Sequence, residues 1–181
     1  MKYLLTGQES TRLRFRLLEK EDFDTWLDLF KNPDVAGFIG FADIPTAEEQ
    51  CKKWFAAVET RYNNDTGGLN VLIDKSTNEF IGQCGLLVQE VDNKQELEIG
   101  YSILPKFWNM GYATEAAQKC RDYAFEHSFT ESIISIVHID NIKSEKVALK
   151  NGMVKSKQTI FRGMPVNIFR INKEEWLTIK K

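Results

Sequence analysis

Residues 96–126 read ELEIGYSILPKFWNMGYATEAAQKCRDYAFE and carry the clearest structural pattern of the chain. Residues 98–104 are rich in isoleucine, leucine and tyrosine, which is typical of a buried strand, and Pro105 ends it. A loop that contains Gly111 follows over residues 106–112, and from Ala113 onward small and apolar residues return at helical spacing. The stretch therefore predicts a strand, a glycine-containing loop and a helix that packs closely through alanines.

The helix start predicted after this loop is suited to bind an anion. The first turn of a helix has backbone N–H groups without an internal partner, and the peptide dipoles place partial positive charge there. Gly111 allows the backbone to approach a phosphate closely, and the small Ala113 allows the helix to lie near its strand. We therefore expect a phosphate or pyrophosphate held mainly by backbone groups, although turn geometry alone is another reason for such a glycine. The chain has neither a GxxxxGK loop nor a GxGxxG pattern.

Residues 105–115, PKFWNMGYATE, resemble the acetyl-CoA pyrophosphate loop of the GNAT superfamily of N-acetyltransferases, whose pattern is Q/R-x-x-G-x-G/A. The longer phrase EIGYSILPKFWNMGYATEA is similar to the RimJ/RimL branch of ribosomal-protein N-terminal acetyltransferases, where tryptophan often occupies the first position. The resemblance implies that backbone groups near Ile103 and Leu104 pair with the pantetheine arm and polarise the thioester of acetyl-CoA. It also implies that the pyrophosphate is held by the loop residues Trp108, Asn109, Met110, Gly111, Tyr112 and Ala113.

Residues 141–153 are similar to a second block of the same family, N-x-x-S-x-x-V-x-x-x-x-G-F, with Met153 in place of the phenylalanine. The resemblance implies that Asn141 contacts the cofactor, while capping of the following helix is its other role. Many family members carry a tyrosine at the position of Ala148, which donates a proton to the leaving CoA thiolate. Because alanine cannot donate, the resemblance assigns this role to Ser144, for which a plain helix-start serine is the alternative.

Glu98 lies on the strand before the loop, and by the same resemblance it is the candidate general base. A neutral amine attacks a thioester, yet an α-amine has a pKa of about 8 and a lysine of about 10.4, so a proton must leave. A buried carboxylate with a raised pKa accepts it directly or through water. The alternative is an exposed strand glutamate, because Glu96, Glu98 and Gly100 share one face. Neither Cys84 nor Cys120 has a recognisable base, so we expect direct transfer in one ternary complex.

The composition is that of an ordinary globular protein. We expect one domain over residues 1–181 with a core at about 11–176, and 43% of the residues are hydrophobic. The net charge of -2 argues against nucleic-acid binding. Cys51, Cys84 and Cys120 are widely spaced and odd in number, so we expect reduced core thiols in a cytoplasmic protein. No signal peptide or membrane segment is expected, no metal-ligand spacing occurs, and a homodimer is left open.

The remaining sequence predicts a mixed α/β fold around this centre. We expect a GNAT-like, mostly antiparallel sheet of six to seven strands with helices on both faces, in which a central parallel pair at Glu98 and Ile133 splays apart. Residues 1–10 are expected to form a loose arm, and the apolar residues of the loop 37–45 to enter the core or line an acceptor groove. The arginines of the strand 11–17 are expected to line its solvated face, and the alternative is that they face a substrate. The other expected strands are 69–74, 79–88, 132–138, 155–161 and 166–171, and the other expected helices are 19–32, 46–62 with a capping box at Thr46, and 142–150, before a terminal turn at Trp176.

These features together predict an acetyl-CoA-dependent N-acetyltransferase that acts on a primary amine. The acceptor stays open between a protein N-terminus and a small amine such as an antibiotic or a polyamine. Asn167, where relatives often carry an acid, gives no help with the acceptor. Two other classes compete with this reading. One is an acyl-CoA-binding module that has lost catalysis, as the missing tyrosine suggests, and the other is an interaction domain on the same scaffold.

Overall fold

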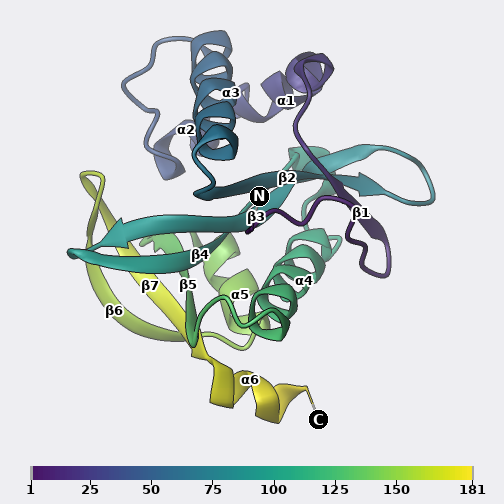
Figure 1. The fold of residues 1–181 in the computed structure, drawn as a ribbon. Coiled ribbons are helices and arrows are strands. Elements are labelled where there is room, and N and C mark those ends of the chain that lie inside the picture. The colour runs from purple at the N-terminus through teal and green to yellow at the C-terminus, as the bar shows by residue number, and fades with distance from the viewer. Residues whose placement is uncertain (1, 181) are drawn as a thin grey trace.

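The computed structural model describes residues 2–180 and places a seven-stranded sheet at the centre of the chain (Figure 1). The strand order is β1-β2-β3-β4-β5-β7-β6, and every neighbouring pair is antiparallel except β4 and β5. The strands are β1 Leu13–Arg16, β2 Gly67–Asp74, β3 Phe80–Val91, β4 Lys94–Ile103, β5 Ser132–His138, β6 Val154–Phe161 and β7 Met164–Asn172. The helices are α1 Phe23–Phe30, α2 Pro33–Phe38, α3 Ala47–Asn63, α4 Tyr112–Glu126, α5 Ile142–Lys150 and α6 Lys173–Ile179, with short 3-10 turns at Lys20–Asp22 and Pro105–Phe107.

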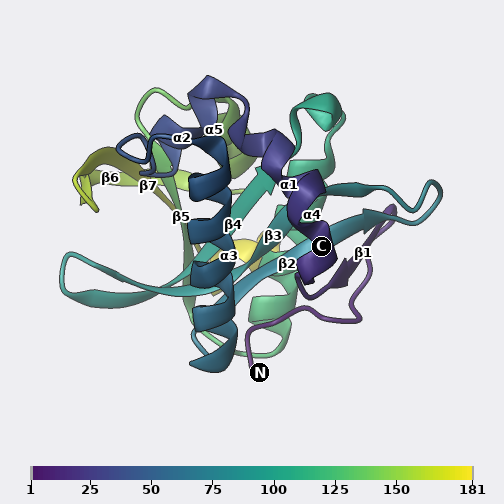
Figure 2. The same cartoon turned by 90° about the horizontal axis from the view of Figure 1, so that it is seen from above.

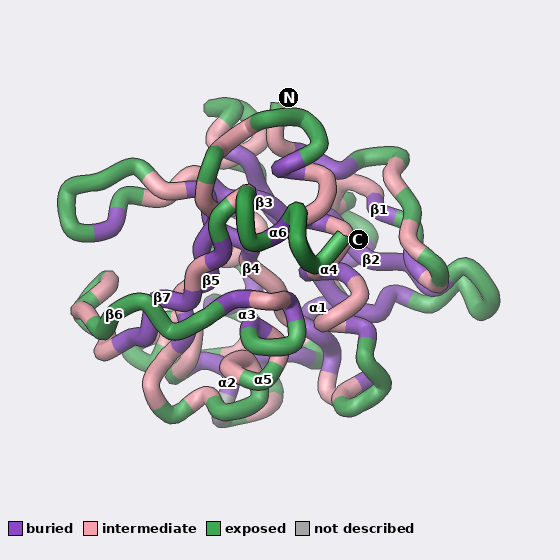
Figure 3. Tube along the Cα trace, turned by 90° about the horizontal axis from the view of Figure 1, so that it is seen from below, coloured by how far each residue is buried: buried purple, intermediate pink, exposed green. Residues whose placement is uncertain are grey.

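Helices cover both faces of this sheet. α1 and α3 lie on one face, and α4 and α5 lie on the other (Figures 1 and 2). The central strands are buried along most of their length, whereas exposed stretches lie on turns and outer helices (Figure 3). α4 lies close to the sheet because its inward side chains are small and fully buried, namely Ala116, Ala117, Cys120 and Ala124. The predicted layered α/β fold with a mostly antiparallel sheet is therefore confirmed.

The sheet opens between its two central parallel strands. β4 and β5 pair only at Leu97 with Ile133 and at Glu98 with Ile134. On its other side β4 stays paired with β3 as far as Ile103. Beyond Glu98, β4 therefore continues without β5 beside it, and a gap opens in the middle of the sheet. The splayed parallel pair expected from the sequence lies at the predicted residues.

Several local expectations about the N-terminal half differ from the structure. Residues 1–10 do not form a loose arm within the described part, because Leu4 and Leu5 are buried and the Leu5 N–H donates to Asn70 Oδ1 at 2.9 Å. The expected helix 19–32 is divided into the 3-10 turn Lys20–Asp22 and α1, which ends at Phe30. Pro33 then begins α2, at a helix start where no backbone N–H is required. The expected loop 37–45 thus starts inside α2.

The helix expected over residues 46–62 begins where it was predicted. The Thr46 hydroxyl accepts a hydrogen bond from the Glu49 N–H at 3.2 Å, which confirms the N-cap of α3. The terminal turn around Trp176 is instead the short helix α6. The three cysteines are free and buried in the core, as expected. Among residues 2–180, no helix is long and apolar enough to span a membrane, and no cluster of His, Cys, Asp or Glu has the arrangement of a metal site.

Candidate active site

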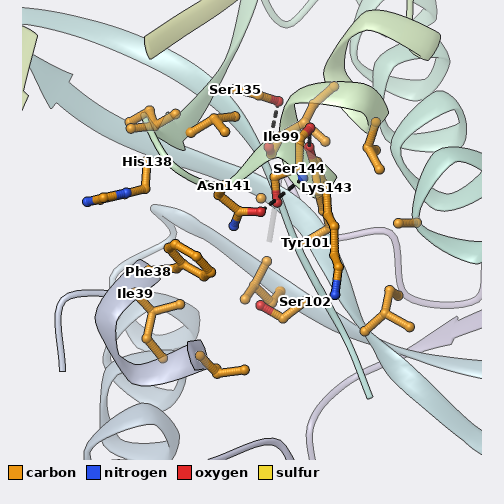
Figure 4. A pocket seen from close by; sticks show the side chains of 18 of the residues that line it. Phe38, Ile39, Ile99, Tyr101, Ser102, Ser135, His138, Asn141, Lys143 and Ser144 are labelled. Atoms are coloured by element: carbon orange, nitrogen blue, oxygen red, sulfur yellow. Dashed lines mark hydrogen bonds between the residues drawn. The ribbon is translucent and has the colours of Figure 1, made fainter. Parts of the chain in front are cut away.

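A cleft of about 860 Å³ lies where β4 and β5 separate. This volume is within the range of roughly 300–1,000 Å³ that is typical of small-molecule sites. The outer half of β4, the end of β5, the loop before α4 and the first turns of α5 line its centre. α2, α3 and the connection between β6 and β7 line one end. Figure 4 shows side chains from both β4 and α5 that meet in the cleft.

The exposed backbone edge of β4 faces the gap. The Leu104 N–H donates to the Ile81 carbonyl of β3 at 3.0 Å. Because backbone groups alternate sides in an antiparallel ladder, Tyr101 and Ile103 direct theirs toward the gap instead. The Ile103 carbonyl there accepts a hydrogen bond from the Trp108 indole at 2.7 Å. Strand-like pairing with a ligand is therefore available at Tyr101 and Ile103, and Leu104 lies in the core with its N–H already bonded.

The loop before α4 presents a helix start to the cleft. Gly111 is the N-cap residue of α4 with φ of 83°, and Asn109 is also left-handed with φ of 62°. The first backbone bond of this helix runs from the Glu115 N–H to the Gly111 carbonyl at 3.1 Å. The N–H groups of the three preceding residues, 112–114, consequently have no intrahelical acceptor. The helix start that the sequence predicted after Gly111 is present, and it borders the cleft.

A charged contact from the N-terminal segment holds this loop in place. Arg12 Nη1 donates to the Met110 carbonyl at 3.0 Å, and Arg12 Nε pairs with Glu115 at 2.6 Å. The same carboxylate accepts the Arg12 N–H and the Ser10 hydroxyl, each at 2.7 Å. Burial alone would raise the pKa of Glu115, but these hydrogen bonds and the Arg12 charge lower it on balance. Arg12 was expected on a solvated strand face, and the structure instead makes it the contact that fixes the loop.

α5 is anchored to β4 across the gap. The Asn141 side chain accepts a hydrogen bond from the Ser144 N–H at 3.1 Å and so caps the helix. Helix capping is one of the two roles expected for Asn141. The Tyr101 hydroxyl donates to the Ser144 carbonyl at 2.8 Å (Figure 4). Burial raises the pKa of Tyr101, so this phenol stays protonated. Ser144 lines the cleft, whereas Ala148 points into the core and is 1% exposed.

The carboxylate of Glu98 is buried in the opening between the strands. Glu98 Oε2 accepts a hydrogen bond from Gln89 Nε2 at 2.7 Å, and the carboxylate also accepts the Ile136 N–H of β5. Burial raises the pKa of Glu98, while Gln89, the charges of Arg61 and Arg162, and the Ile136 N–H oppose this rise. The alternative of an exposed strand glutamate is wrong, because Glu98 is 9% exposed and lines the cleft.

One end of the cleft is apolar and partly closed. We call it the apolar end, and the side chains that define it are Phe38, Ile39, Phe161, Met164 and Val166. The rings of Phe38 and His138 lie 5.5 Å apart across it. Gly40 lies against Met164, since a Cβ at Gly40 would be 3.2 Å from the methionine Cε. The expected loop 37–45 thus contributes to the cleft wall, in addition to packing against the core.

The structure brings most of the predicted site residues together. Those that line the cleft are Glu98, Ser144, Ile103, Trp108, Asn109, Gly111, Tyr112, Ala113 and Asn141. Leu104 is buried in the core, and Met110 is 52% exposed and lies outside the lining. Sequence reasoning missed Arg12, Gln89 and Tyr101. Tyr101 could have been found from its position inside the quoted strand, but the other two depend on contacts between distant segments.

Residues 12–154 match the family model described as acetyltransferase (GNAT) domain. Since this match spans most of the chain, the protein belongs to the GNAT family, and it is an acetyl-CoA-dependent N-acetyltransferase. The chain is 34% identical over 163 residues to the uncharacterized protein YkkB of Bacillus subtilis (strain 168), a match that covers 87% of this chain and 91% of that protein.

Two solved structures share the fold at lower identity. The ribosomal L7/L12 α-N-protein acetyltransferase RimL, in complex with coenzyme A, gives a TM-score of 0.73 at 16% identity and covers 92% of this chain and 97% of its own. Spermidine N-acetyltransferase from Vibrio cholerae, in complex with CoA and spermine, gives a TM-score of 0.71 at 18% identity. The match covers 92% of this chain and 99% of that chain. These neighbours confirm the fold, and they differ in the amine that their names record.

Proposed function

We propose that this enzyme transfers the acetyl group of acetyl-CoA directly to a primary amine, with Glu98 as general base and Ser144 as donor to the leaving thiolate. The amine nitrogen attacks the thioester carbonyl carbon, and the carbon–sulfur bond breaks. The amine proton passes to Glu98, directly or through water, and the CoA sulfur takes a proton from the Ser144 hydroxyl, whose oxygen regains a proton from solvent water. The observation that carries this proposal is the buried carboxylate of β4 and the α5 serine on one cleft at the strand opening.

The cofactor half of the proposal rests on backbone groups. The pantetheine arm would pair with β4 at Tyr101 and Ile103, because these residues face the gap. The pyrophosphate would bind the start of α4. It would be contacted by the residues of this region that line the cleft, Trp108, Asn109, Gly111, Tyr112 and Ala113. Asn141 would border the same region from α5. The N–H groups without helical acceptors and the neighbouring Arg12 guanidinium fit an anionic ligand.

We further propose that the acceptor presents a single reacting amine, either on a peptide N-terminus or on a small monoamine. It would enter at the apolar end, which lies beside Glu98. A polyamine would need a carboxylate for each further ammonium group. The charged side chains that line the cleft include the cations Arg61, Arg162, Lys143, Lys146 and Lys150 against the carboxylates Glu98 and Asp140, so cations outnumber carboxylates. A peptide N-terminus agrees with the RimJ/RimL-like resemblance, and the apolar walls agree with a compact amine.

The test is a thiol-release assay with acetyl-CoA and two matched acceptor panels. One panel contains short peptides with free N-termini and the other contains monoamines and polyamines of equal size. Amine-dependent release of CoA with peptides or monoamines, and weak release with polyamines, is the expected result. Polyamine acetylation at comparable kcat/KM would contradict the acceptor proposal.

A second candidate function is acyl-CoA binding without catalysis, and Ala148 at the usual tyrosine position favours it. Calorimetry with acetyl-CoA separates this candidate from the first. Tight binding without CoA release across both panels would support the binding module. Binding together with amine-dependent release would rule it out.

A further inference from the structure

The side chain of Gln89 connects the candidate base to two arginines. Its Nε2 donates to Glu98 Oε2 at 2.7 Å. Its Oε1 accepts from Arg61 Nη2 at 2.9 Å and from Arg162 Nη2 at 3.4 Å. A glutamine amide has a donor end and an acceptor end, whereas a guanidinium has only donors. Arg61 therefore decides which end of the amide faces Glu98.

Arg61 is itself held in place by the backbone. It comes from the last turn of α3, and its Nη1 donates to the carbonyls of Thr66 at 3.1 Å and Val88 at 3.2 Å. Its planar group is thus fixed beside β3 before any ligand binds. Arg162, in contrast, lies exposed in the turn between β6 and β7 and makes the longer bond to Gln89.

We propose that Gln89 and Arg61 are positioning residues for Glu98. The Arg61 guanidinium orients the Gln89 amide so that the amide N–H stabilises the ionised carboxylate of Glu98. The inference rests on the proposed function in one respect, because an ionised Glu98 matters only if it accepts the amine proton. Without the fixed amide, Gln89 could turn its oxygen toward the carboxylate, and the two acceptors would repel each other. The buried base would then lose a donor that keeps it charged.

Other groups around Glu98 also influence its pKa. Tyr101 lies on the same strand, and the Ile136 N–H faces the carboxylate from β5. Glu96, two residues away on β4, is paired with Arg170 of β7 at 2.7 Å. Burial is the largest influence and raises the pKa of Glu98, and Gln89 leads the influences that lower it. Removal of Gln89 or of Arg61 should therefore raise this pKa further.

The first test measures the titration of Glu98 without any acceptor. Protein with ¹³C-labelled glutamate carboxyl groups is titrated by NMR, and the Glu98 signal is assigned by its absence in Glu98→Gln. Because a hydrogen bond to a charged group favours the ionised form by about tenfold or more, Gln89→Met should move the Glu98 midpoint upward by about one pH unit or more. Gln89 is only half-buried, so methionine should be accommodated there.

Graded variants separate orientation from charge. Arg61→Met should move the midpoint nearly as far as Gln89→Met, and Arg61→Lys should move it less because a cation and one donor remain. Arg162→Met should have a smaller effect, since its bond is longer. The matched control is Arg14→Met, which removes an exposed arginine of β1 that bonds Asn78 and should leave the midpoint unchanged. If Arg61→Met does not fold, Gln89→Met and Arg61→Lys carry the test.

The second test follows kcat/KM against pH with an accepted amine. In Gln89→Met the acidic limb should move upward with the NMR midpoint, giving about a tenfold loss on that limb. An unchanged NMR midpoint in Gln89→Met would overturn the positioning role. A midpoint that moves while the limb stays would leave the positioning role intact and overturn Glu98 as the base. The two failures are thus distinguishable.

Discussion

Replacement of Gly111 by alanine tests whether the left-handed turn before α4 forms the cofactor site. Gly111 has φ of 83°, and an added Cβ would lie 3.5 Å from Arg12 Nη2, which is ordinary contact. The expected penalty therefore comes from the backbone alone and is about 1–2 kcal/mol. If the loop escapes this strain by leaving the left-handed region, the binding-competent conformation becomes less favourable by the same free energy, and its population falls accordingly. The dissociation constant for CoA should then rise roughly 5–30-fold.

Gly163→Ala is the matched control for this prediction. Gly163 has φ of 79° in the turn between β6 and β7, and nothing lies within 4 Å of an added Cβ. Both variants should lose stability, with Tm lower by about 2–8 °C. Only Gly111→Ala should weaken CoA binding when the two are compared by calorimetry at equal salt. The left-handed turn at Gly111 is not the cofactor site if Gly111→Ala binds CoA as tightly as the unmodified protein, or if Gly163→Ala weakens CoA binding equally.

Four other substitutions test individual contacts of the site. Glu98→Gln should lower kcat by about 10²–10⁴-fold while calorimetry finds acetyl-CoA affinity within about twofold, as expected for loss of a general base. Ser144→Ala should lower kcat about tenfold or more with affinity kept, and unchanged rates in both variants would disprove the assigned chemistry. Tyr101→Phe removes the hydrogen bond that ties β4 to α5, so denaturant unfolding should show a loss of about 1 kcal/mol, and no loss would mean that this bond does not hold α5. Glu115→Gln should lower the Tm at pH 7, because hydrogen bonds and the Arg12 charge outweigh burial and depress the pKa of Glu115 below 4.5. A carboxylate with a depressed pKa contributes stability above pH 4.5 that is lost as the pH falls, so the difference in Tm between variant and parent should shrink below that pH. A difference in Tm that stays constant with pH would contradict the role of the charge.

Local sequence signals were enough for the central unit of the protein. The apolar run of β4, the proline after it and the alanine spacing of α4 each act within a few residues, so the strand, the loop and the helix could be predicted in order. The Asn141 cap depends on a side chain and an N–H three residues apart, and it was also predictable. Propensity and hydrogen bonding at short range decide such features, and they do not require knowledge of the remaining fold.

Contacts between distant segments could be decided only by the tertiary structure. Arg12 and Glu115 are 103 residues apart in sequence, and nothing near Arg12 indicates that it fixes the loop before α4. Leu5 is buried because Asn70 of β2 bonds its backbone, although the first ten residues show no periodic pattern.

The buried carboxylate of Glu98, the candidate general base, shows the same division. The residue pattern predicted Glu98 on a strand and left its exposure open, because a period of two is compatible with either face of a sheet. Its burial follows from the place where β5 diverges and from the register that sets Gln89 beside it. Residue identity thus determined the chemistry available to this protein, whereas packing determined which groups are dehydrated, paired and brought to one cleft, since desolvation and hydrogen bonding depend on neighbours that only the folded chain supplies.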